Sequence, residues 1–244
     1  MKWADWKETY LSILKDFSYS VEREVSASMA AMRATSVTRC LKEKDALGEL
    51  RHRIHPDCIV CGNSRELEDD IRELLEGGGM QGFTVIAADA AGPRIGRLGV
   101  IPDIIVTDMD GEPEAEMEQN RRGTLLLLHF HGDNIVLASD VSKLLSGQFI
   151  VTAQSKPQRG VFNFGGFTDG DRSVLLAEEF GARRIVLAGF DFLLPFENGR
   201  DGEIKLRKLE WAKAIIEGVR RRGVMLFGAN EFATLMETNK KVNV

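Results

Sequence analysis

Residues 104–111 read IIVTDMDG, a short run of β-branched residues that ends in two aspartates and a glycine. Short apolar runs recur along the chain and alternate with stretches of helical composition, a pattern typical of βαβ units. We therefore predict a doubly wound α/β fold with a mostly parallel, Rossmann-like sheet covered on both faces. In such sheets ligands bind beyond the carboxyl ends of the strands, so the residues that follow each strand are the ones to inspect.

The predicted elements occupy most of the chain beyond residue 57. The predicted strands are Cys58–Cys61, Phe83–Ala87, Ile104–Thr107, Thr124–His129, Phe149–Thr152, Arg184–Ala188 and Val224–Phe227. The predicted helices are Arg65–Leu75, Arg94–Leu98, Glu114–Arg121, Ile135–Leu145, Arg172–Phe180 and Ile204–Arg221.

The N-terminal region differs in composition from the rest of the chain. Residues 3–53 are rich in Ala, Glu, Lys, Arg, Leu and Met and contain no proline, which favours helix. We predict two helices with a break near residues 16–20. The domain prediction is an N-terminal helical extension, residues 1–55, followed by a catalytic α/β domain, residues 56–244. The extension serves either as a dimerisation arm or as a cover for the sheet.

The second predicted N-terminal helix is amphipathic. Val21, Val25, Met29 and Met32 follow one another at helical spacing and form one apolar face.

Composition excludes several classes of protein. The 244 residues are 43% hydrophobic and 28% charged, an ordinary globular balance. Lys and Arg number 32 against 37 Asp and Glu, a net charge of −5, so no basic excess indicates a nucleic-acid partner. The apolar runs are too short to span a membrane, and the charged first seven residues contain no signal-peptide core. We expect a soluble, cytoplasmic protein, and a homodimer is the default assembly.

The first informative loop is residues 61–64, which follow a predicted strand. Gly62 allows a ligand close to the backbone, and Ser64 can cap a helix whose N-terminus attracts phosphate, with Asn63 between them. An ordinary strand-to-helix turn is the alternative. Cys58 and Cys61 point to opposite faces of a strand, so we interpret them as buried side chains and not as a metal site.

The strongest signal is a set of three aspartates. Asp108 and Asp110 follow one predicted strand, and Asp89 ends its neighbour. Carboxylates at this spacing suit Mg²⁺, which takes one or two protein carboxylates and completes its shell with water and phosphate oxygens. A solvated turn is the alternative for Asp108 and Asp110 alone, but Asp89 adds a third carboxylate at the same sheet edge.

The next loop, residues 129–134, contains two histidines. His129 and His131 lack the companion ligands of a closed zinc site, so neutral imidazoles that bind phosphate or substrate are the favoured interpretation. Asp133 either caps the next helix or acts as another metal or substrate ligand, and Asn134 follows it.

A long loop before the helix at residue 172 completes the set. Its glycines and phenylalanines suit a pocket for a planar ring, and Arg172 suits phosphate; a plain surface lid is the alternative. Asp191 ends a further strand. Carboxylates at one edge repel unless a cation compensates, so the sequence predicts a metal-assisted site for a phosphorylated ligand. The candidate residues in this part of the chain are Gln154, Asn163, Gly165, Gly166, Thr168, Asp169, Arg172 and Asp191.

These motifs resemble the archaeal 6-hydroxymethyl-7,8-dihydropterin pyrophosphokinases, which are distantly similar to thiamine pyrophosphokinases. The resemblance rests on residues 88–91 and 98–111, together with residues 129–134, 163–172 and 189–192. It covers about residues 58–192, in matching order.

The resemblance implies transfer of diphosphate from ATP to a hydroxymethyl pterin, with Mg²⁺ as cofactor and AMP as product, in tetrahydromethanopterin or folate biosynthesis. It implies metal ligation by Asp108 and Asp110, assisted by Asp89 and Asp133, with Asp108, Asp110 and Asp133 as catalytic residues. Contacts to the pterin would come from Asn134, Asn163, Asp169 and Asp191, under Phe164 and Phe167. The other implied nucleotide- and substrate-binding residues are Gly62, Asn63, Ser64, Asp89, His129, His131, Gln154, Gly165, Gly166, Thr168 and Arg172.

Three alternatives remain from the sequence. A metal-dependent nucleotide-sugar glycosyltransferase would use Asp108 and Asp110 in the same way and release a nucleoside diphosphate. A thiamine pyrophosphokinase-like enzyme would keep the chemistry and change the acceptor. A protein that senses a nucleotide would bind ATP without turnover.

Overall fold

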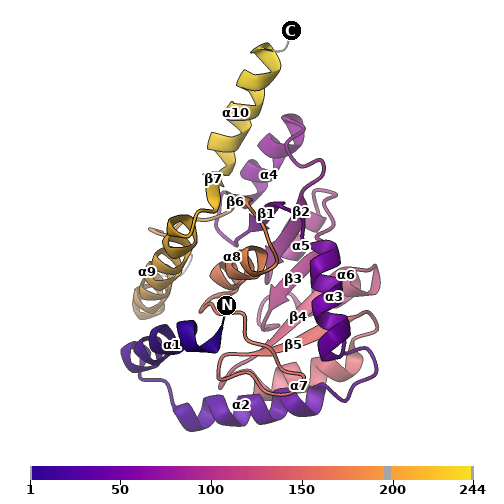
Figure 1. The fold of residues 1–244 in the computed structure, drawn as a ribbon, viewed down its shortest axis with the longest axis vertical. Coiled ribbons are helices and arrows are strands. Elements are labelled where there is room, and N and C mark those ends of the chain that lie inside the picture. The colour runs from indigo at the N-terminus through magenta and orange to yellow at the C-terminus, as the bar shows by residue number, and fades with distance from the viewer. Residues whose placement is uncertain (1, 195–198, 243–244) are drawn as a thin grey trace.

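Seven parallel strands form one sheet through the centre of the molecule (Figure 1). The computed structural model describes residues 2–194 and 199–242. The strands are β1 (Asp57–Cys61), β2 (Thr84–Ala88), β3 (Ile104–Thr107), β4 (Leu125–Phe130), β5 (Phe149–Ala153), β6 (Arg184–Ala188) and β7 (Met225–Gly228). The predicted α/β fold and all seven predicted strands are confirmed, with ends that differ by one residue at most.

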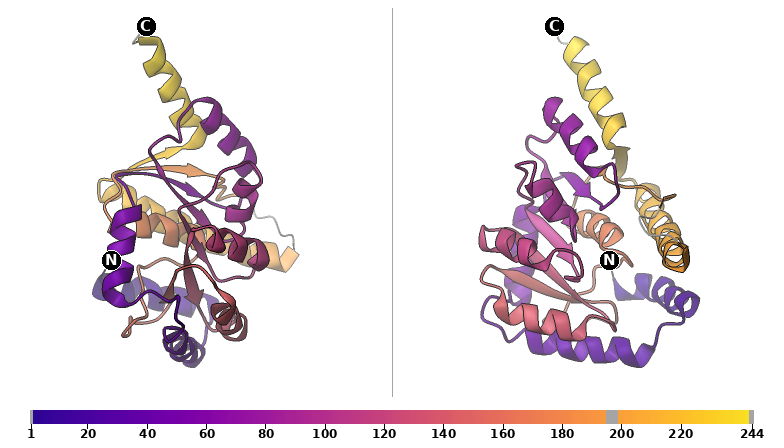
Figure 2. Two further views of the ribbon diagram at one scale, coloured as in Figure 1. Left: turned by 90° about the vertical axis from the view of Figure 1, so that its right-hand side faces the viewer. Right: turned by 180° about the vertical axis from the view of Figure 1, so that it is seen from behind.

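Helices cover both faces of this sheet. They are α1 (Trp3–Phe17), α2 (Val21–Ala34), α3 (Glu43–Arg53), α4 (Leu67–Glu76), α5 (Ala91–Gly96), α6 (Pro113–Arg121), α7 (Ile135–Leu144), α8 (Asp169–Glu179), α9 (Gly199–Arg221) and α10 (Ala229–Val242). Figure 2 shows α10 extending beyond the sheet from the edge at β7. Among the residues that the structure describes, no helix combines the length and the apolar character needed to cross a membrane.

The strand order places a switch point next to β1. The order is β5-β4-β3-β2-β1-β6-β7, so the chain moves outward from β1 to β5 and then returns through α8 to the other side of β1. The ends of three strands are level there, because Cys61 pairs with Ala87 of β2 and with Ala188 of β6. A switch point of this kind is where open α/β sheets bind ligands.

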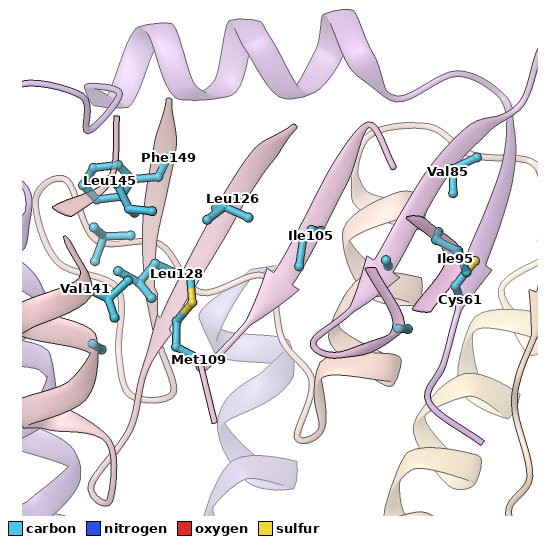
Figure 3. Close-up of a cluster of buried hydrophobic side chains, with 14 of the residues drawn as sticks. Cys61, Val85, Ile95, Ile105, Met109, Leu126, Leu128, Val141, Leu145 and Phe149 are labelled. Atoms are coloured by element: carbon cyan, nitrogen blue, oxygen red, sulfur yellow. The ribbon is translucent and has the colours of Figure 1, made fainter. Parts of the chain in front are cut away.

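Alternating side chains of the strands build two hydrophobic cores. In β1, Ile59 and Cys61 face the core that α2, α4, α5, α7 and α10 cover. Figure 3 shows part of this core, including Cys61. Cys58 and Val60 face the opposite core, under α1, α3, α8 and α9. The cysteines therefore lie on opposite faces, as predicted, and burial raises the pKa of both thiols to about 12. Their thiols stay protonated and are poor metal ligands.

The N-terminal region forms three helices, where the sequence predicted two. The break near residues 16–20 is confirmed: Ser18 adopts a left-handed φ of 55°, and the side chain of Ser20 caps α2. A second break follows α2 because residues 39–41 run along the edge of β5. There the N–H of Leu41 donates to the carbonyl of Phe149 at 2.9 Å. α10 was also not predicted.

The apolar face predicted for α2 points outward. Val21, Val25, Met29 and Met32 are between 41% and 53% exposed. The buried face instead carries alanines, among them Ala27, Ala31 and Ala34, which pack toward β4, β5 and α7. Small side chains let the helix approach the sheet closely, which the larger Val and Met side chains would prevent.

This orientation of α2 predicts different costs for two substitutions. Ala31→Leu should lower the free energy of unfolding by about 1–3 kcal/mol, because Ala31 is 0% exposed and a larger side chain overpacks the core. Met29→Ser should change it by about 0.5 kcal/mol or less, because the side chain is half exposed. Urea denaturation of both variants checks this. An equal loss in both would contradict the orientation.

Candidate active site

A cavity of about 430 Å³ opens at the carboxyl edge of the sheet, beside the switch point. Loops after the strands form its floor, while the α1–α2 junction, the start of α8 and one face of α9 form its walls. The predicted site residues that line it are Gly62, Asn63, Ser64, Asp89, Asp108, Asp110, His131, Asp133, Gln154, Thr168, Asp169, Arg172 and Asp191. The structure thus brings most of the sequence candidates into one cavity.

Three carboxylates meet on the floor of this cavity. Asp89, Asp108 and Asp110 each place one oxygen within 4.8 Å of the others. Such a set of oxygen donors fits a hard divalent cation of the Mg²⁺ type. Asp133 lies apart from the group, and its carboxylate forms an ion pair of 2.8 Å with Arg23 of α2.

Local backbone geometry makes the three carboxylates converge. Asp89 and Met109 have left-handed φ angles of 49° and 68°, which turn the chain sharply at the ends of β2 and β3. Thr107 joins the two turns, since its hydroxyl donates to Asp89 at 3.2 Å and accepts the N–H of Met109 at 2.9 Å. Gly111 is required as well: a Cβ there would lie 2.5 Å from Oδ2 of Asp89.

The pKa values of the two aspartates that follow β3 are shifted in opposite directions. Burial tends to raise the pKa of Asp108, but hydrogen bonds from His131 and Asp110 outweigh it and hold that pKa below its usual range. Burial, and then the negative charge of Asp108, raise the pKa of Asp110 to about 7. At neutral pH Asp108 is ionised, while Asp110 retains a proton part of the time.

Hydrogen bonds assign the tautomer of His131. Its Nδ1 accepts the N–H of Asp133 at 3.3 Å, so the proton resides on Nε2 and is donated to Oδ2 of Asp108 at 3.0 Å. Asn134 secures this arrangement, since its amide donates to the carbonyls of Asp108 and His129 and accepts the N–H of His131. Asn134 is buried and joins two loops, whereas the resemblance implied a contact with the pterin.

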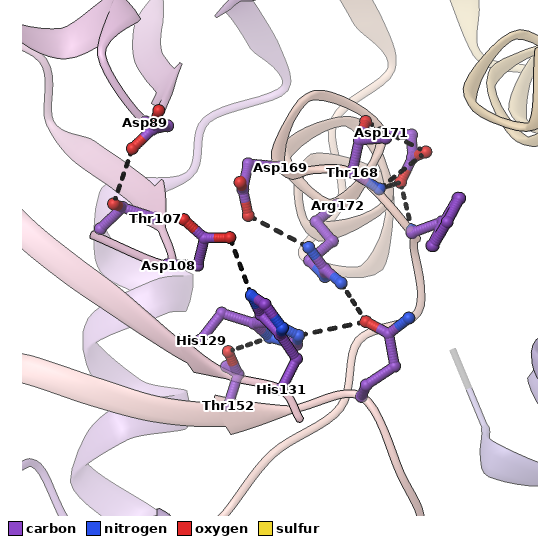
Figure 4. Close-up of polar contacts among 12 residues, drawn as sticks. Asp89, Thr107, Asp108, His129, His131, Thr152, Thr168, Asp169, Asp171 and Arg172 are labelled. Atoms are coloured by element: carbon purple, nitrogen blue, oxygen red, sulfur yellow. Dashed lines mark hydrogen bonds and ion pairs between the residues drawn. The ribbon is translucent and has the colours of Figure 1, made fainter. Parts of the chain in front are cut away.

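A second polar network links buried His129 to Arg172, which lines the cavity (Figure 4). His129 is buried, and its ring nitrogens contact the hydroxyl of Thr152 at 2.9 Å and Oε1 of Gln154 at 3.2 Å. Arg172 also donates to that oxygen of Gln154 and forms an ion pair of 3.1 Å with Asp169. Burial, and then the charge of Arg172, lower the pKa of His129, so the imidazole is neutral.

The glycine-rich loop before α8 shapes this network from behind. Asn163 donates to the carbonyls of Gln154 and Ser155 and accepts the N–H of Gly165, so its amide is used within the loop. A Cβ on Gly166 would lie 2.4 Å from Cγ of Arg172, which explains the glycine there. These loop residues line a separate, smaller hollow or the interior, and not the main cavity.

The switch point itself forms the other end of the cavity. A Cβ on Gly62 would lie 2.6 Å from the carbonyl oxygen of Gly189, so the ends of β1 and β6 come together only with glycine. Asn63 accepts a hydrogen bond from Arg94 at 2.7 Å, and Ser64 donates to Glu66. Asp191 accepts the N–H groups of two residues that follow it.

Comparison with known proteins agrees with this geometry. The family model described as "6-hydroxymethylpterin diphosphokinase MptE-like" matches residues 34–195. The chain belongs to this family. It is 36% identical over 239 residues to a 6-hydroxymethyl-7,8-dihydropterin pyrophosphokinase of Pyrococcus furiosus, covering 91% of this chain and 96% of the relative. The relative of the same name from Methanothermobacter thermautotrophicus is 35% identical and covers 89% of this chain and 95% of its own length.

Two walls of the cavity in this MptE-like protein lie outside the matched range, and sequence reasoning missed both. From the α1–α2 junction, Tyr19 and Glu24 line the cavity, and Oε1 of Glu24 accepts the N–H of Gly132 at 3.0 Å. From α9, Lys205 and Lys208 line it. One signal could have revealed Glu24, because it is the charged residue on the alanine face of α2.

The shifted pKa values of the aspartates predict pH-dependent metal binding. A cation bound by the three carboxylates would have to displace the proton that Asp110 retains, so we expect Mg²⁺ affinity to rise by about tenfold per pH unit below pH 7 and to level off above it. Calorimetric titration at a series of pH values checks this.

Two aspartate variants serve as the test and its matched control. Asp110→Asn should bind more weakly and lose the pH dependence, while Asp140→Asn, on the exposed surface of α7, should behave like the parent protein. A flat pH profile in the parent protein would contradict the assignment.

Proposed function

We propose that this protein is a 6-hydroxymethyl-7,8-dihydropterin diphosphokinase, which transfers diphosphate from ATP to the hydroxymethyl group of the pterin and releases AMP. The single observation that carries the proposal is the convergence of Asp89, Asp108 and Asp110 on the cavity floor in a member of this family. The names of the relatives support the acceptor, and the carboxylate set supports metal-assisted chemistry on a phosphate ester.

The proposed reaction is a single displacement. The hydroxymethyl oxygen attacks the β-phosphorus of ATP and loses its proton as the new O–P bond forms. The bond from that phosphorus to the oxygen bridging it to the α-phosphate breaks, and AMP leaves with the bond's electron pair. Catalysis of this kind relies on positioning the reactants in line and on neutralising charge, without a covalent intermediate.

The carboxylate cluster supports a role for Mg²⁺. Asp89, Asp108 and Asp110 would hold it, and it would neutralise phosphate charge during transfer. His131 would keep the carboxylate of Asp108 oriented through its Nε2–H. The assisting role expected for Asp133 stays a prediction.

The two ends of the cavity suit different substrates. Tyr19 and Phe167 line one end, and both pack with Phe17, whose ring stacks on Tyr19 at a centroid distance of 5.5 Å. An aromatic wall of this kind suits the flat pterin ring. The glycines and helix entry at the switch point suit the nucleotide. Phe164, expected beside Phe167, packs instead with Phe162 and Phe180.

An assay of nucleotide products tests the proposal. The purified protein is incubated with Mg²⁺, ATP and 6-hydroxymethyl-7,8-dihydropterin, and products are separated by chromatography. AMP formed together with a pterin diphosphate is the expected result. AMP formed only with thiamine, or a nucleoside diphosphate formed only from sugar nucleotides, would replace the proposal with one of the alternatives.

A substitution at the cluster gives the accompanying prediction. Asp108→Asn should lower kcat at least about 100-fold, because a lost metal ligand removes several kcal/mol of transition-state stabilisation. Its thermal unfolding should remain cooperative, and Asp140→Asn serves as the exposed control. A fully active Asp108→Asn variant would refute the metal assignment.

The cytoplasmic location and the homodimer expected from the sequence stay predictions.

A further inference from the structure

The positive charges around the cavity fall into two classes. Arg23 is engaged with Asp133 at 2.8 Å, and Arg172 is engaged with Asp169 at 3.1 Å and with Gln154. Lys205 and Lys208 also line the cavity, and neither has a hydrogen-bond or ion-pair partner among the residues that the structure describes. Of the four cations, the two ammonium groups are therefore the ones that can bind a ligand without giving up a partner among the described residues.

The orientation of α9 is fixed by contacts on another of its faces. Arg207 donates to Asp16 at 2.6 Å and Trp211 donates to the same carboxylate at 2.9 Å. The guanidinium of Arg207 also lies over the ring of Phe17, 4.8 Å from its centroid. α9 is attached to the end of α1 in this way, and Lys205 and Lys208, three residues apart on the same helix, both line the cavity.

Lys205 lines the same cavity as the carboxylate cluster. Its charge is near enough to Asp110 to oppose the rise in the pKa of that group. A phosphate chain that reaches a cation held by the three aspartates would therefore pass beneath α9. A lysine ammonium is a compact charge with three donors and binds phosphate oxygens well.

We propose that Lys205 and Lys208 bind the phosphates of ATP from the α9 side of the cavity, opposite the carboxylate cluster. The inference rests on the proposed function. Lys205 contacts the diphosphoryl group that is transferred and stabilises that group in the transition state. Lys208, one turn further along α9, holds the remainder of the phosphate chain. α9 thereby supplies the positive wall that the acidic floor lacks.

Direct binding of a stable ATP analogue tests the inference. The probe is α,β-methylene-ATP, in which a methylene group replaces the bridging oxygen of the bond that the reaction breaks. In calorimetric titrations with Mg²⁺ present, Lys205→Ala and Lys208→Ala should each weaken binding about tenfold or more, the usual effect of removing a charged hydrogen-bond donor. Lys205→Arg and Lys208→Arg should recover most of the affinity, because they keep the charge.

Kinetics and a matched control separate binding from folding. Both alanine variants should raise KM for ATP while KM for the pterin stays the same, and Lys205→Ala should also lower kcat. Lys213→Ala, exposed on the same helix and outside the cavity lining, should behave like the parent protein in every measurement. Equal thermal unfolding of all variants would exclude a general loss of structure.

The possible results distinguish this inference from the proposed function. If the parent protein binds the analogue and forms AMP, but Lys205→Ala and Lys208→Ala bind equally well, the inference is wrong and the function stands. If the parent protein neither binds the analogue nor forms AMP, both are wrong.

Discussion

The mutual repulsion of three carboxylates is the constraint on which this structure depends. Asp89, Asp108 and Asp110 are held within 4.8 Å, although like charges at this spacing destabilise the folded chain. Two local features reduce this repulsion: His131 donates a hydrogen bond to Asp108, and the raised pKa of Asp110 allows that carboxyl to keep a proton. Left-handed turns at Asp89 and Met109 keep the groups from separating. Carboxylates held together against electrostatic preference in this way suit the cation that we propose.

The polar residues behind the cluster extend the same principle inward. Asn134 ties the loop after β4 to the loop after β3, so the position of His131 is fixed relative to Asp108. The buried, neutral His129 and the Gln154 amide link β4 and β5 to Arg172 without adding a charge of their own. The carboxylates on the cavity floor are thus supported by a network of hydrogen bonds that joins neighbouring loops and strands.

The features that the sequence predicted correctly are those encoded by residues close together in the chain. The strands were predicted because parallel strands buried on both faces are continuous apolar runs, and the aspartates were predicted because the ends of parallel strands share one edge. The alternation of side chains along a strand also predicted correctly that Cys58 and Cys61 point to opposite faces of the sheet. The prediction of which face of α2 packs on the sheet was wrong, because it considered the hydrophobicity of the side chains and not their size. Alanines pack nearer to a sheet than Val25 or Met29 can.

The remaining differences arise from tertiary structure. His129, Asn134 and Asn163 have the residue types of ligand-binding groups, and only the packed structure shows that their polar atoms bond to other groups of the protein. Lys205 and Lys208 look like any charged pair on a surface helix. Their position depends on Asp16, nearly two hundred residues earlier, which attaches α9 to α1 through Arg207 and Trp211. No spacing within α9 encodes that contact.

The floor and the walls of the cavity belong to different parts of the chain. The acidic floor lies within the range that the family model matches, residues 34–195, and its geometry is determined by short loops with little freedom. The aromatic wall at Tyr19 and the lysine wall of α9 lie outside that range, on helices held by surface contacts such as the one between Asp16 and Arg207. Chemistry that depends on the floor is therefore constrained by the strands themselves. In the proposed function, recognition of the two substrates would depend on these two walls, which helices supply and not the strands that carry the carboxylates.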